Sequence, residues 1–282
     1  MQMPVPQSRD QYAVFGNPIA HSKSPTIHMA FALETGQPIS YVTELAPLDG
    51  FAQCVADFIE RGGRGFNVTV PFKEEAWALV DERSPRAELA GAVNTVLVQS
   101  NGRLFGENTD GVGLVRDLTH NHEVELAGRS ILMLGAGGAA RGAVGPLLSE
   151  GPSRLVIANR TIERARVLAN DFRTYASVVP SYAEYADLSA HQPFDVIINA
   201  TAAGLSGDVP PVPLTALVLR GCCYDMVYAD VATPFQRWAR AAGADVALDG
   251  LGMLAEQAAE AFRVWRGVLP PTAGVIAELR IR

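Results

Sequence analysis

The 282-residue sequence has little of what marks secreted or metal-binding proteins. Its three cysteines, Cys54, Cys222 and Cys223, are odd in number and two are adjacent, so a disulfide framework is not expected. No Cys/His spacing resembles a zinc site, and we predict no metal. Few, unpaired cysteines are typical of small apolar core residues in the reducing cytoplasm, which is where we expect this protein.

Long apolar segments and basic charge are also missing. No apolar run approaches the ~20 residues that a membrane-spanning helix needs, and the polar N-terminus lacks the apolar core of a secretory signal. The formal net charge is −7, from 23 basic and 30 acidic residues. A duplex-binding protein needs a basic face, so we expect neither membrane nor nucleic acid as a partner. Small anions are not excluded, because a local basic pocket can hold them.

The first part of the chain alternates between expected strands and helices. Strands are expected at 11–16, 39–46 and 65–70, and helices at 24–36 and 50–63. This alternation is typical of βαβ units with a largely parallel sheet. The stretch "AVNTVLVQSNGRLFGENTD" then reads as two strands joined at Asn101-Gly102, a strong hairpin signal. We therefore predict a mixed sheet with an antiparallel part.

A second alternating series begins near residue 129. Its expected strands cover 129–135, 154–159, 177–180, 194–201, 222–228 and 244–250, and the tail at 252–267 and 272–282 reads as helical. Two series, each with its own strands, predict two α/β domains.

A glycine loop opens the second series. In "ILMLGAGGAARGAV", Gly135, Gly137 and Ala140 form G-x-G-x-x-A directly after an apolar strand and before a small-residue helix, as dinucleotide binding requires. Gly135 permits the tight turn, Gly137 lets the backbone approach a pyrophosphate, and Ala140 allows close packing of helix on strand. The helix N-terminus offers unpaired N–H groups to the phosphates.

The end of the next strand indicates which dinucleotide binds. An NAD enzyme places an acidic residue there to hold the ribose, but this chain has Asn159 and Arg160. An arginine suits a 2′-phosphate, and Arg164 lies one turn further on, so the two signals together predict NADP. The competing interpretation is an ordinary tight turn followed by a solvated basic helix start.

Polar residues also gather at the expected strand ends of the first part. Val68, Thr69 and Val70 read as a buried strand that Pro71 ends, with Lys73 just beyond it. Lysine can act as a general acid or base when burial and neighbours tune its pKa. The other candidates are Ser22, Ser24, Asn94, Asn108, Thr109 and Asp110. Each has an ordinary alternative as a helix cap, a turn residue or a solvated lysine, and sequence alone leaves a Lys73–Asp110 pairing open.

Nine motifs in order resemble the shikimate dehydrogenase family. They run from residue 16 to beyond residue 250 as "GNPIAHSKSP", "NVTVPFK", "GAVNT", "ENTDG", "GAGGAAR", "NRT", "NAT", "YDMVY" and "GLGMLAEQA". The resemblance implies NADP-dependent, reversible reduction of 3-dehydroshikimate to shikimate in aromatic amino-acid biosynthesis.

The resemblance also implies roles for individual residues. Lys73 and Asp110 match the catalytic pair, with Lys73 as proton donor or electrostatic stabiliser and Asp110 orienting substrate and lysine. The implied substrate-binding residues are Ser22 and Ser24 for the carboxylate, and Thr69, Lys73, Asn94, Asp110, Tyr228 and Gln257 for the rest of the molecule. The implied NADP contacts are Gly135, Ala136, Gly137, Gly138, Ala139, Asn159, Arg160, Thr161, Arg164, Thr201, Met226 and Gly250.

The implied organisation is a mixed-sheet substrate domain and a Rossmann-type NADP domain with the active site in the cleft between them. We expect the substrate domain at 1–110, completed by helices at 249–282, and the NADP domain at 111–248. Two alternatives stay open: an enzyme with relaxed choice of quinate or NAD, and a catalytically silent NADP sensor on the same fold. The expected assembly is a monomer or a homodimer.

Overall fold

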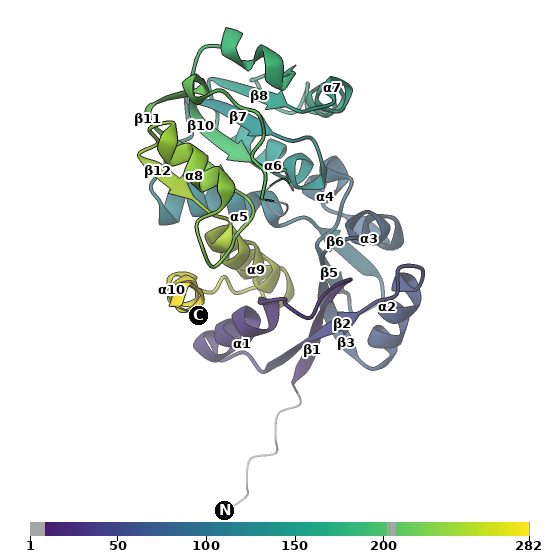
Figure 1. The fold of residues 1–282 in the computed structure, drawn as a ribbon. Helices are drawn as coiled ribbons and strands as arrows, with labels where there is room; N and C mark the ends of the chain where they lie inside the picture. Colours follow the sequence, from purple (N-terminus) through teal and green to yellow (C-terminus); the bar gives the residue numbers. More distant parts are fainter. Residues whose placement is uncertain (1–8, 202, 204–206, 282) are drawn as a thin grey trace, which may run out of the picture. The chain divides into compact units, whose positions relative to one another are not determined.

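A computed structural model describes residues 9–201, 203 and 207–281. The chain divides into two compact units, Met1–Thr109 with Ala258–Val275, and Asp110–Gln257 with Ile276–Arg282. Within the described residues each unit is built on a six-stranded sheet (Figure 1). None of the described helices is long and apolar enough to cross a bilayer.

The sheet of the first unit is mixed. Its strands follow the order β2-β1-β3-β5-β6-β4, where β1, β2 and β3 are parallel and β5 is antiparallel to both β3 and β6. The strand bounds are β1 Asp10–Gly16, β2 Ile39–Leu45, β3 Gly63–Val68, β4 Glu82–Arg83, β5 Thr95–Val98 and β6 Leu104–Glu107. Gly102 has φ +81° in the turn between β5 and β6, so the predicted hairpin is confirmed.

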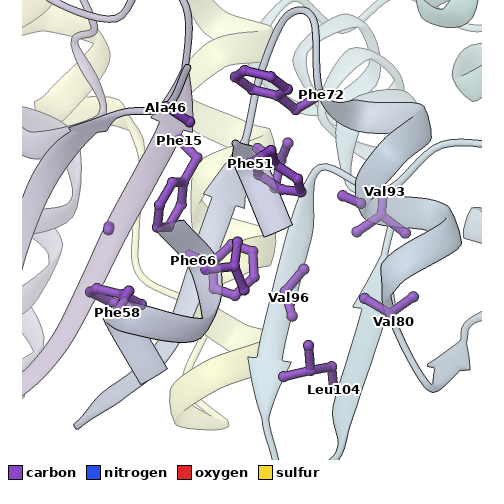
Figure 2. Close-up of a cluster of buried hydrophobic side chains, with 14 of the residues drawn as sticks. Phe15, Ala46, Phe51, Phe58, Phe66, Phe72, Val80, Val93, Val96 and Leu104 are labelled. Carbon is purple, nitrogen blue, oxygen red and sulfur yellow. The ribbon is translucent and has the colours of Figure 1, made fainter. Parts of the chain in front are cut away.

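Helices cover both faces of this sheet. On one face lie α2 (Phe51–Glu60), α3 (Lys73–Leu79) and α4 (Pro85–Ala90), and on the other lie α1 (Ser24–Thr35) and the end of α9 (Leu251–Arg266). Figure 2 shows the core under α2, where Phe15, Phe51 and Phe66 are fully buried. Burial of each such phenylalanine contributes about 1.5–3 kcal/mol, so this core fixes the strand ends that follow.

The second unit has a parallel sheet in the order β12-β11-β10-β7-β8-β9. The strands are β7 Ser130–Leu134, β8 Arg154–Ala158, β9 Ser181–Ala183, β10 Phe194–Asn199, β11 Leu217–Asp225 and β12 Val246–Leu248. The order reverses between β7 and β10, which is the doubly wound pattern in which ligands bind beyond the carboxyl ends of the strands.

The second unit's helices are α5 (Asp110–Arg116), α6 (Gly138–Ser149), α7 (Ile162–Asp171) and α8 (Pro234–Ala241), and α10 (Ala273–Ile281) ends the chain. Phe235 and Ala239 of α8 bury against one face of the sheet, and α6 and α7 cover the other. Helices α5 and α6 approach closely because a Cβ at Gly111 would lie 2.2 Å from the carbonyl oxygen of Gly142.

The structure differs locally from the predicted strands. Strand β3 ends at Val68, and the Val70 side chain is 62% exposed, so the buried strand does not continue to Pro71. The strand expected at 177–180 is absent among the described residues, and β9 begins after Pro180, which has no N–H to donate to a ladder. The two-residue strand β4 is too short to show a pattern in sequence.

Candidate functional site

The candidate residues of the first unit lie at one edge of its sheet. Strands β1, β3 and β6 end at this edge, and antiparallel β5 begins there, because Phe15 pairs with Val68, Asn67 with Thr95, and Thr95 with Glu107. The loops that leave these strand ends carry Ser22, Thr69, Asn94 and Thr109, and so they meet at the edge.

Ser22 and Ser24 stand where the loop after β1 becomes α1. Ser24 is the first residue of α1 and is 8% exposed, while Ser22 is half-buried. The main-chain N–H of Ser24 donates to Ser22 Oγ over 3.3 Å, and Ser22 N–H donates to the carbonyl of Ile19 over 3.0 Å. Two serine hydroxyls at a helix N-terminus suit an anionic group such as a carboxylate.

Lys73 and Asn94 are joined through their neighbours. Lys73 begins α3, and its carbonyl accepts the N–H of Val93 over 2.9 Å. This bond places Lys73 beside the segment that enters β5. Thr69 follows β3 and donates its N–H to the carbonyl of Phe15 over 2.9 Å. The first unit therefore brings Thr69, Lys73 and Asn94 to the same sheet edge.

The Asn94 side chain is held in one orientation. It is 2% exposed, and its Oδ1 accepts the N–H of Thr109 over 2.9 Å and the hydroxyl of Thr95 over 3.0 Å. Its Nδ2 donates to Thr109 Oγ1 over 3.0 Å. Because a main-chain N–H can only donate, the amide atom that faces the Thr109 N–H must be the oxygen Oδ1. The amide nitrogen Nδ2 is then the atom that donates to Thr109 Oγ1.

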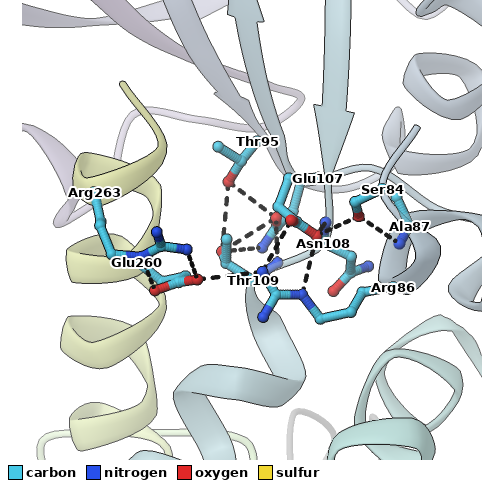
Figure 3. A network of polar contacts seen from close by, with 10 residues as sticks. Ser84, Arg86, Ala87, Thr95, Glu107, Asn108, Thr109, Glu260 and Arg263 are labelled. Carbon is cyan, nitrogen blue, oxygen red and sulfur yellow. Dashed lines mark hydrogen bonds and ion pairs between the residues drawn. The ribbon is translucent and has the colours of Figure 1, made fainter. Parts of the chain in front are cut away.

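A buried ion network supports the Thr109 loop (Figure 3). Glu107 accepts the N–H of Asn108 over 2.8 Å, and it also accepts the hydroxyl of Ser84. Arg86 donates to Glu107 and to Glu260, and Glu260 in turn accepts from Arg263. Glu107 and Glu260 are 6% and 1% exposed, so both carboxylates depend on these partners. The sequence prediction missed this network because its members are far apart in the chain.

Three predicted substrate residues belong to the second unit. Asp110 is the half-buried first residue of α5, and burial raises the pKa of Tyr228 above its ordinary value. Gln257 lies on α9, where its Nε2 donates to the carbonyl of Leu254 over 3.0 Å. A Cβ at Gly113 of α5 would lie 2.7 Å from Gln257 Cβ, so α5 and α9 pack closely at this residue.

The glycine loop has the shape that a dinucleotide needs. Gly135 directly follows β7 with φ +101°, and a Cβ there would lie 3.1 Å from Thr201 Cγ2. Gly137 caps α6 without a side-chain hydrogen bond, and a Cβ at Gly137 or Gly138 would meet open space. The N-terminal N–H groups of α6, with Ala136 and Ala139 beside the glycines, are therefore accessible to a pyrophosphate.

Two exposed arginines follow the next strand. Asn159 Nδ2 donates to the carbonyl of Thr161 over 2.9 Å and shapes the turn into α7. The side chains of Arg160 and Arg164 are exposed, and neither forms an ion pair within the described residues. Free guanidinium groups at this strand end suit a phosphate on the adenosine ribose.

The remaining cofactor candidates lie at the ends of β10 and β11. Thr201 donates from Oγ1 and N–H to Asn199 Oδ1, over 2.7 and 3.1 Å. A Cβ at Gly250 would lie 2.3 Å from the carbonyl oxygen of Met226, so these two residues are in contact.

Asp225, which the sequence prediction missed, supports this end of the sheet. It accepts from Asn199, Thr233 and the N–H of Val227. Burial raises the pKa of Asp225, and these hydrogen bonds oppose the rise. The second unit thus brings the predicted residues at the ends of β7, β10 and β11 to one edge of its sheet.

Comparison with known proteins gives the family. Three family models match: the shikimate dehydrogenase substrate binding domain at residues 14–96, shikimate/quinate 5-dehydrogenase at 117–210, and the shikimate 5′-dehydrogenase C-terminal domain at 250–280. The chain is 57% identical over 277 residues to a shikimate dehydrogenase (NADP(+)) of Alkalilimnicola ehrlichii, covering 96% of this chain and 98% of that one. The chain belongs to the shikimate dehydrogenase family.

Similar solved structures agree. An Ael1 enzyme from Pseudomonas putida is 45% identical, with a TM-score of 0.90 over 97% of this chain and 99% of that one. The shikimate 5-dehydrogenase of Thermus thermophilus in complex with NADP(H) and shikimate is 38% identical, with a TM-score of 0.84 over 96% and 99%. The predicted shikimate dehydrogenase family and two-domain α/β fold class are confirmed.

Proposed function

We propose that this enzyme catalyses the reversible, NADP-dependent reduction of 3-dehydroshikimate to shikimate in aromatic amino-acid biosynthesis. One observation carries the proposal: the chain is 57% identical, over 96% of its length, to a curated relative named shikimate dehydrogenase (NADP(+)). The activity and the cofactor predicted from the sequence agree with that name and are confirmed. The proposed substrate domain is 1–110 with 249–282 and the proposed NADP domain 111–248, bounds that differ from those of the two compact units at residues 110, 249–257 and 276–282.

The proposed site assigns each group a task. Ser22 and Ser24 hold the substrate carboxylate, and Thr69, Asn94, Tyr228 and Gln257 bind the rest of the molecule. NADPH supplies the hydride when bound. Lys73 gives the proton to the oxygen that becomes the new hydroxyl, and Asp110 accepts hydrogen bonds from the substrate hydroxyls. A positioned ammonium at this point also stabilises developing negative charge on that oxygen.

The cofactor residues are proposed from the shape of the second unit. Gly135, Gly137 and Gly138 with Ala136 and Ala139 surround the pyrophosphate. Asn159, Arg160, Thr161 and Arg164 bind the adenosine ribose phosphate, and Thr201, Met226 and Gly250 border the nicotinamide. The open N-terminus of α6 and the exposed arginines support this assignment.

One set of assays tests the proposal against its alternatives. Formation of the reduced cofactor is measured with shikimate and with quinate, in each case with NADP and with NAD. The proposed enzyme gives its highest kcat/KM with shikimate and NADP. Comparable rates with quinate or NAD would indicate the enzyme of relaxed choice, and binding of NADP without turnover would indicate the silent sensor. The proposed assembly, monomer or homodimer, and the cytoplasmic location stay predictions.

A further inference from the structure

Tyr41 and Asn67 form a buried hydrogen bond beside Asn94. Tyr41 lies on β2 and Asn67 on β3, with β1 between these strands, so the tyrosine reaches across a strand. The Tyr41 hydroxyl donates to Asn67 Oδ1 over 2.7 Å. Both residues are buried, with 5% and 6% of their surface exposed. Burial raises the pKa of Tyr41 well above its ordinary value, so the hydroxyl remains a donor.

The surroundings of this bond are aromatic. The His28 ring stacks on Tyr41 with a centroid distance of 4.3 Å and an interplanar angle of 10°, and Trp265 lies 6.2 Å away. Placing a hydroxyl and an amide among rings costs free energy that apolar side chains of the same volume would not cost. Packing alone therefore does not explain why polar groups occupy this position.

The directions of the hydrogen bonds are fixed by one acceptor. The main-chain carbonyl of Asn94 can only accept, so the Asn67 atom 3.1 Å from it is the amide nitrogen. The same nitrogen donates to Thr95 Oγ1 over 3.0 Å. Asn67 Oδ1 must then face Tyr41, and Tyr41 must be the donor. Loss of the tyrosine hydroxyl would remove the 2.7 Å hydrogen bond that holds the Asn67 oxygen, and leave it only the neighbouring His28 ring.

The series of bonds ends at Asn94. Thr95 accepts from Asn67 and donates to Asn94 Oδ1 over 3.0 Å. Asn67 therefore reaches Asn94 twice, directly at its carbonyl and through Thr95 at its side chain. A rotation of the Asn67 amide would disturb both the backbone and the side-chain orientation of Asn94.

We propose that Tyr41 is a positioning residue for the substrate, which orients Asn67 and through it Asn94. The proposal rests on the proposed function, since it gives Asn94 the role of binding a substrate oxygen. Tyr41 acts through Asn67, to which its hydroxyl donates, and that hydroxyl also lies within hydrogen-bond reach of the Ser24 side chain. Its hydroxyl keeps the amide of Asn94 in the binding orientation before the substrate arrives, which lowers the cost of ordering the site on binding.

The test is Tyr41→Phe, which removes only the hydroxyl. We expect KM for shikimate to rise about 3- to 10-fold, the range for one neutral hydrogen bond, with KM for NADP unchanged and a smaller change in kcat. The matched control is Tyr12→Phe. Tyr12 is buried, stacks on Trp265 at 4.7 Å and accepts from Arg266, outside the Asn94 network. Tyr12→Phe should lower Tm by a few degrees, about as much as Tyr41→Phe does, and leave KM for shikimate unchanged.

A double-mutant cycle separates positioning from general destabilisation. In an Asn94→Ala background, Tyr41→Phe should change KM by less than about twofold, because the residue that it positions is gone. Equal effects in both backgrounds, or equal effects of the two tyrosine variants, would overturn the proposal. If Asn94→Ala by itself leaves shikimate kinetics unchanged, the proposed substrate site fails and this inference fails with it.

Discussion

Arg86 and Glu107 form a two-point ion pair in which Nη2 lies 2.8 Å from Oε2 and Nε lies 3.2 Å from Oε1. The same Nη2 lies 3.2 Å from a second buried carboxylate, Glu260 Oε1. Burial disfavours charge on Arg86, but its hydrogen bonds and ion pairs with Glu107 and Glu260 outweigh this and raise its pKa. One guanidinium thus bridges two buried carboxylates, of which Glu260 also accepts from Arg263.

Removal of the Arg86 guanidinium should destabilise the folded protein. We expect Arg86→Met to lower the free energy of unfolding by about 3–5 kcal/mol, because two buried carboxylates lose a shared partner. The control is Arg103→Met, whose partner Glu82 lies 2.6 Å away in an exposed pair and whose loss should cost less than about 1 kcal/mol. Urea unfolding of both variants gives the comparison. Equal losses would show that the buried network contributes no more than a surface pair.

The buried His28 ring should make the stability of the fold depend on pH. The ring is fully buried, and burial lowers its pKa from 6.5 to about 3. Neither ring nitrogen has a hydrogen-bond partner among the described residues, although the Asn67 amide is close enough to oppose the shift in part. Below pH 6.5 the unfolded chain binds a proton on this ring that the folded chain does not, so stability falls as the pH decreases towards 3.

The contribution of His28 can be isolated by substitution. Between pH 8 and pH 5 the ring should cost about 2 kcal/mol of stability, at about 1.4 kcal/mol for each pH unit below 6.5. His28→Phe should therefore lose less stability over this interval than wild type by that amount. Urea unfolding at the two pH values measures it, with the exposed His120→Gln as control. A wild-type pH dependence in His28→Phe would contradict the prediction.

The sequence predicted most elements because each leaves a local pattern. The βα alternation, the hairpin at Gly102 and the turn at Gly135 depend on a few adjacent residues, and the structure has all three. The end of β3 and the position of β9 were wrong by a few residues. At these points the apolar pattern continues, but the pairing with a neighbouring strand does not.

The supporting residues of the site could not be predicted in this way. Tyr41 looks in sequence like an ordinary strand residue, and Asn67 and Glu107, although they open the motifs "NVTVPFK" and "ENTDG", show nothing there of which side chains they contact. Their partners lie on other strands, such as Asn67 Oδ1 for the Tyr41 hydroxyl, and the register between those strands decides which side chains meet. The predicted catalytic and binding residues were found instead because the family resemblance implies their roles without any knowledge of contacts.

Lys73 is the proposed proton donor, so its loss should reduce turnover. We expect Lys73→Ala to lower kcat by about 10²–10⁴-fold, the usual contribution of a positioned acid or base. KM for NADP should change little, because the proposed cofactor residues lie in the other unit. Steady-state kinetics with both substrates varied give the two constants. Near-normal turnover would remove Lys73 from the mechanism.

Ser22 and Ser24 should act on binding and less on turnover. The substrate carboxylate is remote from the reacting carbon, so its hydrogen bonds are similar in the ground and transition states. Ser22→Ala and Ser24→Ala should each raise KM for shikimate, by an amount equivalent to about 1.5–3 kcal/mol for a bond to a charged group, and lower kcat less. Titration with shikimate at saturating NADP tests this. An unchanged KM in both variants would place the carboxylate elsewhere.

Arg160 should decide the choice between NADP and NAD. Its exposed guanidinium follows β8, and it is close enough to Tyr185 to lower that residue's pKa against the larger effect of burial. Arg160→Ala should weaken NADP binding by about 1.5–3 kcal/mol, or about ten- to more than a hundredfold, and leave NAD almost unchanged. The matched control is Arg166→Ala on the following helix, α7, whose guanidinium is already bonded to Glu163 over 2.5 and 2.8 Å. The measurement is kcat/KM for both cofactors at low and high salt, since an exposed phosphate contact should weaken with ionic strength. If Arg160→Ala moves the NADP-to-NAD ratio by less than about twofold, or no more than Arg166→Ala does, other residues bind the phosphate.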